Sequence, residues 1–175
     1  MFLWVGLLLD ENYGNNIKNK CQKLNKSLLL DEKAFELPTH ISLKISFQIN
    51  ENQKEEIINE ILLVVRKYLP LKVTSSHIER NNNIIWSLFE YNQILNDIHN
   101  ELDERLLHFN VSKHMFDENF IFHSTLFMDD CNEKINSMYE LIKNMDIKST
   151  NTIDTIIIGS SNDGVNFKIE LLEKV

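Results

Sequence analysis

Apolar and polar residues alternate most regularly between residues 40 and 49. Apolar side chains occupy every second position of this segment, at Ile41, Leu43, Ile45, Phe47 and Ile49. Successive side chains of a β-strand point to opposite faces. The pattern therefore predicts a strand with one apolar and one polar face.

Other segments repeat their apolar residues every three to four positions, which is typical of amphipathic helices. This spacing predicts helices over residues 17–28, 57–69, 91–106 and 130–145, the second of them ending before Pro70. Short runs of apolar and β-branched residues predict strands over residues 2–9, 72–78, 84–89, 120–128, 152–158 and 165–171. The strands at 72–78 and 84–89, and the last two, are each expected to form a hairpin.

The order of these elements repeats along the chain, and so do their offsets. In each half a strand and a helix lead into a strand that carries a histidine, and Trp4 lies 36 residues before His40 as Trp86 lies 37 residues before His123. We therefore expect one α+β domain over residues 1–175, with two lobes of about 1–80 and 81–175 related by a pseudo-twofold axis. Two small antiparallel sheets would line a central groove, with helices outside; whether the lobes exchange strands stays open.

Composition and charge narrow the function. The chain is 43% hydrophobic and 25% charged, as globular proteins are. Its 18 Lys and Arg against 26 Asp and Glu give a formal net charge of −8, which disfavours long DNA and anionic membranes as partners. Cys21 and Cys131 are too few for a disulfide scaffold and lack metal-ligand spacing, so we expect a protein of the reducing cytoplasm. The apolar start lacks the features of a signal peptide and is too short to span a membrane, so we expect it to form a buried strand.

Two tetrapeptides carry the candidate chemistry, His40-Ile41-Ser42-Leu43 and His123-Ser124-Thr125-Leu126. Residues i and i+2 of a strand share a face, so each imidazole should lie beside its hydroxyl. Two such strands in opposed lobes would gather both pairs around one pocket. One histidine could then accept a proton from an attacking oxygen while the other donates one to the leaving oxygen. The hydroxyls could donate to phosphate oxygens, and no metal would be needed.

Lys44 and four further histidines are the other polar residues of interest. Lys44 continues the polar face two residues beyond Ser42, so it is predicted to contact a bound phosphate. The remaining histidines lack a hydroxyl at i+2 and metal-ligand spacing, so we expect surface or capping roles for His77, His99, His108 and His114.

The paired motifs, their separation of 83 residues and the duplicated element order resemble the 2H phosphoesterase superfamily, in its bacterial branch labelled 2′-5′ RNA ligase or cyclic phosphodiesterase-like. The resemblance covers the whole chain in element order but only the two tetrapeptides in sequence. It implies activity without metal or cofactor, with His40, Ser42, His123 and Thr125 as site residues. Family members commonly have Pro before each histidine, where this chain has Thr39 and Phe122.

The resemblance also implies a function. We expect a phosphodiesterase for 2′,3′-cyclic phosphates or 2′-5′-linked ribonucleotides, acting in RNA processing as a monomer on a small cyclic nucleotide or a short RNA end. By resemblance, His123 with Thr125 would deprotonate water and His40 would protonate the leaving ribose oxygen. Sequence leaves open the acid and base roles, the choice of hydrolysis or ligation, and the substrate. An alternative is a nucleotide or RNA-end binding protein without turnover.

Overall fold

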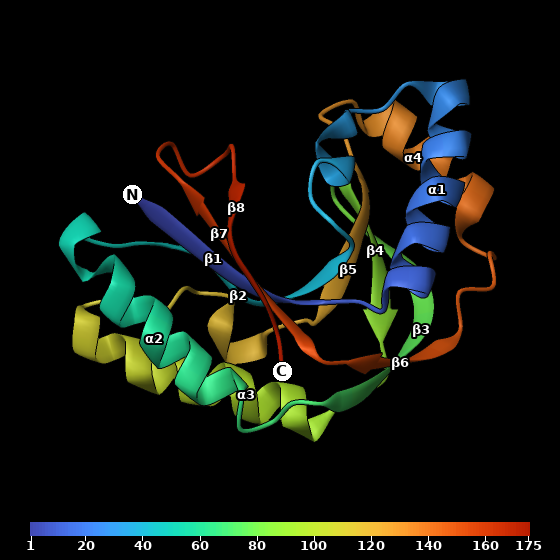
Figure 1. Ribbon diagram of the computed structural model, residues 1–175. Coiled ribbons are helices and arrows are strands. Elements are labelled where there is room, and N and C mark those ends of the chain that lie inside the picture. Colours follow the sequence, from blue (N-terminus) through green and yellow to red (C-terminus); the bar gives the residue numbers. More distant parts are fainter.

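The computed structural model describes residues 1–175, apart from the side chain of Glu11. Its strands form two four-stranded antiparallel sheets, seen in Figure 1 as two walls that diverge from a shared base. The strands are β1 (Phe2–Leu8), β2 (His40–Gln48), β3 (Leu71–Asn81), β4 (Ile84–Phe89), β5 (His123–Met128), β6 (Ser149–Ile153), β7 (Thr155–Ser161) and β8 (Lys168–Lys174). The α+β class with two antiparallel sheets is confirmed.

The four predicted helices are present. They are α1 (Glu11–Leu28), α2 (Lys54–Val65), α3 (Gln93–Leu106) and α4 (Asn132–Ile142), with short 3₁₀ turns η1 (Glu32–Phe35), η2 (Glu51–Gln53), η3 (Leu107–Phe109) and η4 (Asp117–Asn119). The helix α1 begins after Asp10, whose carboxylate accepts hydrogen bonds from the backbone N–H groups of Asn12 and Tyr13. The predicted second helix is shorter than expected, since α2 ends at Val65.

Each sheet is covered on its outer face by two helices. Sheet A has the strand order β2-β1-β7-β8 and packs against α2 and α3, whereas sheet B has the order β5-β4-β3-β6 and packs against α1 and α4. Although α1 directly follows a strand of sheet A, its apolar residues Ile17 and Cys21 contribute to the core of sheet B. The first helix thus connects the two halves of the molecule (Figure 1).

Sheet A takes its strands from both ends of the chain, and sheet B takes its strands from the middle. The prediction of a single strand over residues 152–158 is wrong. The strand is interrupted at Asp154, so that β6 pairs with β3 in sheet B while β7 pairs with β1 in sheet A. An apolar run does not signal such a change, because both parts are buried strands with similar residues. A single domain over residues 1–175 remains our proposal, and the strand order shows that the predicted lobes of about residues 1–80 and 81–175 exchange strands.

None of the helices in the described part of the chain combines the length and the apolar character that crossing a membrane requires.

Candidate active site

The two motif histidines line one cleft between the sheets. His40 and Ser42 come from β2 of sheet A, and His123 comes from β5 of sheet B. The cleft has a volume of about 620 Å³, within the range of small-molecule sites. Trp4 of β1 and Trp86 of β4 also line it. The structure therefore brings together the two histidines that the sequence predicted to share a pocket.

The backbone fixes the orientation of both imidazole rings. The Nδ1 atom of His40 lies 2.7 Å from the carbonyl oxygen of Pro38, and Nδ1 of His123 lies 2.7 Å from the carbonyl oxygen of Ile121. A carbonyl oxygen can only accept, so each Nδ1 carries the hydrogen in the neutral ring. The Nε2 atom of each ring is then the atom that can accept or release a proton.

Each histidine packs against a tryptophan. The ring centroids of Trp4 and His40 lie 4.3 Å apart at an interplanar angle of 65°, and those of Trp86 and His123 lie 4.0 Å apart at 23°. Aromatic packing of this kind restricts the ring and can stabilise the imidazolium form. Sequence reasoning missed both tryptophans as site residues. The signal in the sequence is their near-equal spacing from the two histidines, which indicates duplication but not that the indoles pack on the imidazoles.

The two motif hydroxyls differ in their surroundings. The indole Nε1 of Trp4 donates to Ser42 Oγ over 3.0 Å, so the hydroxyl hydrogen of Ser42 remains available for another acceptor. Thr125 lies opposite Trp86 in the β4–β5 pair and lines a smaller pocket of about 160 Å³ together with His40 and Lys33. The Nε1 atom of Trp86 is buried without a hydrogen-bond partner among the described atoms.

Both rings titrate below their ordinary range. Burial lowers the pKa of His40 to about 4; the Pro38 carbonyl opposes this shift, and the charge of a protonated His123 adds to it. Burial also lowers the pKa of His123, against the opposing effect of the Ile121 carbonyl. Because both pKa values lie below the ordinary value for histidine, both rings are largely neutral near pH 7 in the free protein.

Lys44 is not in the cleft, and its prediction as a phosphate contact is wrong. In the pairing of β1 with β2, Gly6 lies opposite Ser42 but Val5 lies opposite Lys44, so β2 holds one extra residue between these pairs. Such a bulge moves the following side chains to the other face of the sheet. The Lys44 side chain is consequently directed to the buried side of sheet A, where it is 2% exposed.

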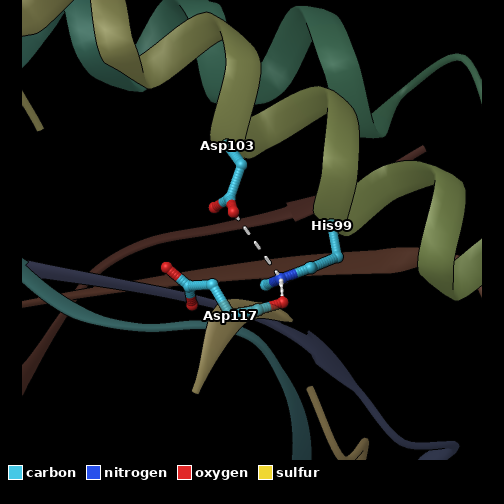
Figure 2. Close-up of side chains that lie close together, drawn as sticks. All are labelled: His99, Asp103 and Asp117. Carbon is cyan, nitrogen blue, oxygen red and sulfur yellow. Dashed lines mark hydrogen bonds and ion pairs between the residues drawn. The ribbon is translucent and has the colours of Figure 1, made fainter. Parts of the chain in front are cut away.

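Lys44 meets two carboxylates on that buried side. Its Nζ lies 2.5 Å from Asp103 Oδ1 and 2.7 Å from Asp117 Oδ2. His99 completes the group and is 3% exposed, so the expected surface or capping role for His99 is wrong. Figure 2 shows His99 and Asp103 projecting from α3 towards Asp117. These three side chains could hold a metal ion by their spacing, but the ammonium group of Lys44 already supplies a cation to both carboxylates.

The cleft itself carries little charge. Among its described lining residues none is Lys, Arg, Asp or Glu, and the only titratable ones are the two histidines. The apolar part of the wall includes Ile45, Phe116, Phe120 and Phe167, and the polar part includes Asn81, Asn82 and Asn83 at the β3–β4 turn. Within this cleft a bound anion would therefore be stabilised by hydrogen bonds and by protonated histidine, and Lys33 lines the adjoining smaller pocket.

Comparison with curated proteins gives one informative relative. The chain is 30% identical over 121 residues to a protein of Geobacillus thermodenitrificans named "Putative phosphoesterase", a match that covers 67% of each chain. No model of a protein family matches the chain.

Comparison with solved structures gives several similar folds. The crystal structure of Escherichia coli LigT complexed with 3′-AMP has a TM-score of 0.64 at 12% identity, covering 99% of this chain and 97% of that one. LigT complexed with NADP⁺ has a TM-score of 0.62 at 12% identity, with 99% and 96% covered. A further crystal structure, described as a phosphoesterase, has a TM-score of 0.61 at 12% identity, with 99% and 97% covered. At this identity the likeness concerns the fold.

Proposed function

Because this chain belongs to the 2H phosphoesterase superfamily, we propose that it is a cyclic phosphodiesterase that hydrolyses a 2′,3′-cyclic phosphate on a nucleoside or a short RNA end. One observation carries the proposal. Two imidazoles, each with Nδ1 bound to a backbone carbonyl and Nε2 left to exchange a proton, line one cleft together with a serine hydroxyl. General acid–base catalysis of phosphodiester hydrolysis needs two such groups.

The proposed reaction starts with a water molecule between His123 and the phosphorus atom. The Nε2 atom of His123 accepts a proton from this water as its oxygen forms a bond to phosphorus. The bond from phosphorus to one ribose oxygen breaks, and that oxygen takes the proton from Nε2 of His40. The product is a nucleoside monophosphate, and a proton passes from His123 back to His40 through solvent before the next turnover. These roles follow the family resemblance. They require that the bound phosphate anion favours protonation of His40, whose ring is largely neutral near pH 7 in the free protein.

The hydroxyl groups have a separate part in the proposal. Because Ser42 Oγ accepts from Trp4, the Ser42 hydroxyl can donate to a non-bridging phosphate oxygen, where charge increases in the transition state. Thr125 would donate in the same way from the opposite strand. Lys44 has no part in the site, since it is buried away from the cleft.

The cleft also favours a small substrate. Its volume of about 620 Å³ suits a mononucleotide, and its apolar wall offers aromatic faces for a base. None of its described lining residues is a Lys or Arg that could bind a second phosphate group. LigT structures hold 3′-AMP and NADP⁺, which supports a nucleotide ligand here. The formal net charge of −8 disfavours binding of long polyanions through electrostatic repulsion.

We expect the protein to act in the cytoplasm.

Hydrolysis of nucleoside 2′,3′-cyclic phosphates in the presence of EDTA tests the proposal. We expect release of a nucleoside monophosphate that is unaffected by the chelator, and a loss of at least about 10³-fold in kcat for His40→Ala and for His123→Ala. The matched control is His108→Ala, which replaces an exposed histidine in η3 outside the cleft. Tight nucleotide binding without turnover, or wild-type rates in both motif variants, would contradict the proposal.

A further inference from the structure

A second group of ionisable side chains lies on the buried side of sheet A, outside the cleft. We call Lys44, His99, Asp103 and Asp117 the buried charge cluster; each of them is at most 6% exposed. They come from β2, α3 and η4, three elements that are distant in sequence. Figure 2 shows three of them directed at one another from α3 and from the segment of η4.

The hydrogen bonds of His99 indicate its protonation state. Its Nδ1 lies 2.7 Å from the carbonyl oxygen of Leu43, and its Nε2 lies 3.1 Å from the carbonyl oxygen of Asp117. A neutral imidazole has one N–H, so one of its nitrogens would present a lone pair to a carbonyl oxygen. Only the doubly protonated ring donates to both. The carboxylate of Asp103, with Oδ2 3.8 Å from Nε2, favours the same charged form.

We propose that His99 is a positioning residue that is held as an imidazolium and connects the two segments that carry the active histidines. Leu43, which accepts from Nδ1, follows Ser42 in β2 at the bulge. Asp117, which accepts from Nε2, begins η4, and the chain from there supplies Asn119, Phe120 and Ile121 to the cleft. The proposal rests on the proposed function in one respect: the position of these two segments affects catalysis only if the protein is the proposed hydrolase.

Two further contacts extend the connection to the cleft. Phe120, which lines the cleft, stacks on the ring of His99 with centroids 4.4 Å apart. The carbonyl of Ile121, four residues after Asp117, accepts from Nδ1 of His123. The ring of His99 thereby holds the wall of the cleft and the carbonyl that orients one active histidine at a fixed place relative to β2.

The charges of the cluster balance. Lys44 and His99 contribute two positive charges, and Asp103 and Asp117 contribute two negative ones, as burial of charge requires. At the rim, Lys113 Nζ lies 3.9 Å from Asp103 Oδ2, and the backbone N–H of His114 donates to Asp117 Oδ2 over 2.6 Å. Burial raises the pKa of Asp117, but the Lys44 hydrogen bond and the His114 amide outweigh it, and the net pKa is lowered. A neutral His99 would leave Lys44 as the only buried cation for the two carboxylates, with Lys113 at the exposed rim.

The first test needs no variant. In long-range ¹H–¹⁵N spectra of the wild-type protein, His99 would be assigned through its contact with Phe120. At pH 7 we expect both of its ring nitrogens at imidazolium shifts, with the exposed rings of His77 and His108 as references in the same spectrum. An unprotonated ring nitrogen in His99 at that pH would overturn the proposal. This result is independent of any enzymatic activity.

The second test separates positioning from stability. His99→Gln alone leaves the carboxylates in excess and should lower the Tm, whereas His99→Gln combined with Asp103→Asn restores the balance and should recover most of the Tm. We expect the double variant to keep a kcat at least about tenfold below wild type, because no ring then donates to both the Leu43 and the Asp117 carbonyls. A recovered Tm together with a wild-type kcat in the double variant would overturn the positioning role.

The two proposals can fail separately. If the wild-type protein turns over no cyclic phosphate, the proposed function fails, and the nitrogen spectrum still decides whether His99 is an imidazolium. If turnover occurs but the His99 ring is neutral, the positioning proposal fails alone. If the double variant does not fold, the spectrum of the wild-type protein remains the deciding measurement.

Discussion

At the scale of single residues, a backbone carbonyl decides which nitrogen of each active histidine is available. Pro38 and Ile121 each lie two positions before the histidine whose Nδ1 they bind. The same contact from a ring to the preceding backbone thus occurs in both halves of the molecule, and it selects the Nδ1–H tautomer without any side-chain carboxylate. This differs from a histidine oriented by an aspartate, because a neutral carbonyl stabilises the imidazolium less than a carboxylate does.

The pH dependence of the reaction follows from these surroundings. Catalysis needs one ring protonated and the other neutral, so kcat/KM is largest between the two pKa values. Burial lowers the pKa of His40 to about 4 and places that of His123 below 6.5. We expect a bell-shaped profile with its maximum below pH 6.5 and a decline as pH rises further, because both rings are then neutral. Measuring kcat/KM from about pH 4 to about pH 8 tests this. A maximum at or above pH 7 would contradict it.

The two tryptophans offer a matched pair of variants. Trp4→Phe keeps an aromatic ring beside His40 but removes the N–H that donates to Ser42. We expect kcat/KM to fall by about three- to tenfold, as for the loss of one hydrogen bond of about 1 kcal/mol. Trp86→Phe removes an N–H without a partner among the described atoms, so kcat/KM should change by less than about twofold. Equal losses in the two variants would contradict this difference.

At the scale of elements, the bulge in β2 is the feature that most changes the site. Up to Ser42 the polar positions of the strand face the cleft, and beyond the extra residue Lys44 faces the core side. Because of this inserted residue, β2 has polar side chains on both of its faces. His40 and Ser42 face the cleft, and the ammonium group of Lys44 faces α3 and η4 on the other side.

The packing of Trp4 across β1 and β7 depends on small residues. A Cβ atom at Gly159 would lie 2.9 Å from Trp4 Cε3 and 3.4 Å from the carbonyl oxygen of Lys168. Gly159→Ala should therefore displace Trp4, lower the free energy of unfolding by about 1–3 kcal/mol and reduce kcat/KM, because Trp4 packs on His40. Urea unfolding and steady-state kinetics measure both effects.

The control for this change is Gly14→Ala in α1. A Cβ atom there has its nearest neighbour at 3.4 Å, the Cβ of Thr39, which is an ordinary contact. Replacing glycine inside a helix should raise the free energy of unfolding by up to about 1 kcal/mol and leave kcat/KM unchanged. If Gly159→Ala were as well tolerated as Gly14→Ala, the packing argument for Trp4 would be wrong.

At the scale of the whole molecule, the chain crosses between the two sheets several times. Sheet A needs β1 and β2 from the first half of the sequence and β7 and β8 from the second, and α1 covers sheet B. The two histidines are brought to one cleft by this exchange, since β2 and β5 belong to different sheets.

This topology predicts how fragments behave. We expect neither residues 1–80 nor residues 81–175 to fold alone, because each fragment lacks the strands that complete sheet A. Each should unfold without a cooperative thermal transition by circular dichroism, whereas the full chain should show one. A fragment with a cooperative transition of its own would favour two independent lobes.

The sequence predicted the elements and the two histidine motifs, because both depend on local spacing. Period-two alternation placed His40 beside Ser42, helical spacing located the four helices, and the repeated offsets indicated two similar halves. These are properties of neighbouring residues along the chain, and the side-chain geometry of strands and helices converts them directly into faces.

Only the tertiary structure decided which face Lys44 takes, where the strand near Asp154 is interrupted, and that His99 is buried between two carbonyl oxygens. A bulge, a change of sheet and a buried ion pair are set by partners far away in sequence, so the residues on either side carry no local signal of them. The sequence by itself therefore determined the candidate chemistry of this protein, and long-range packing decided the charge of its cleft.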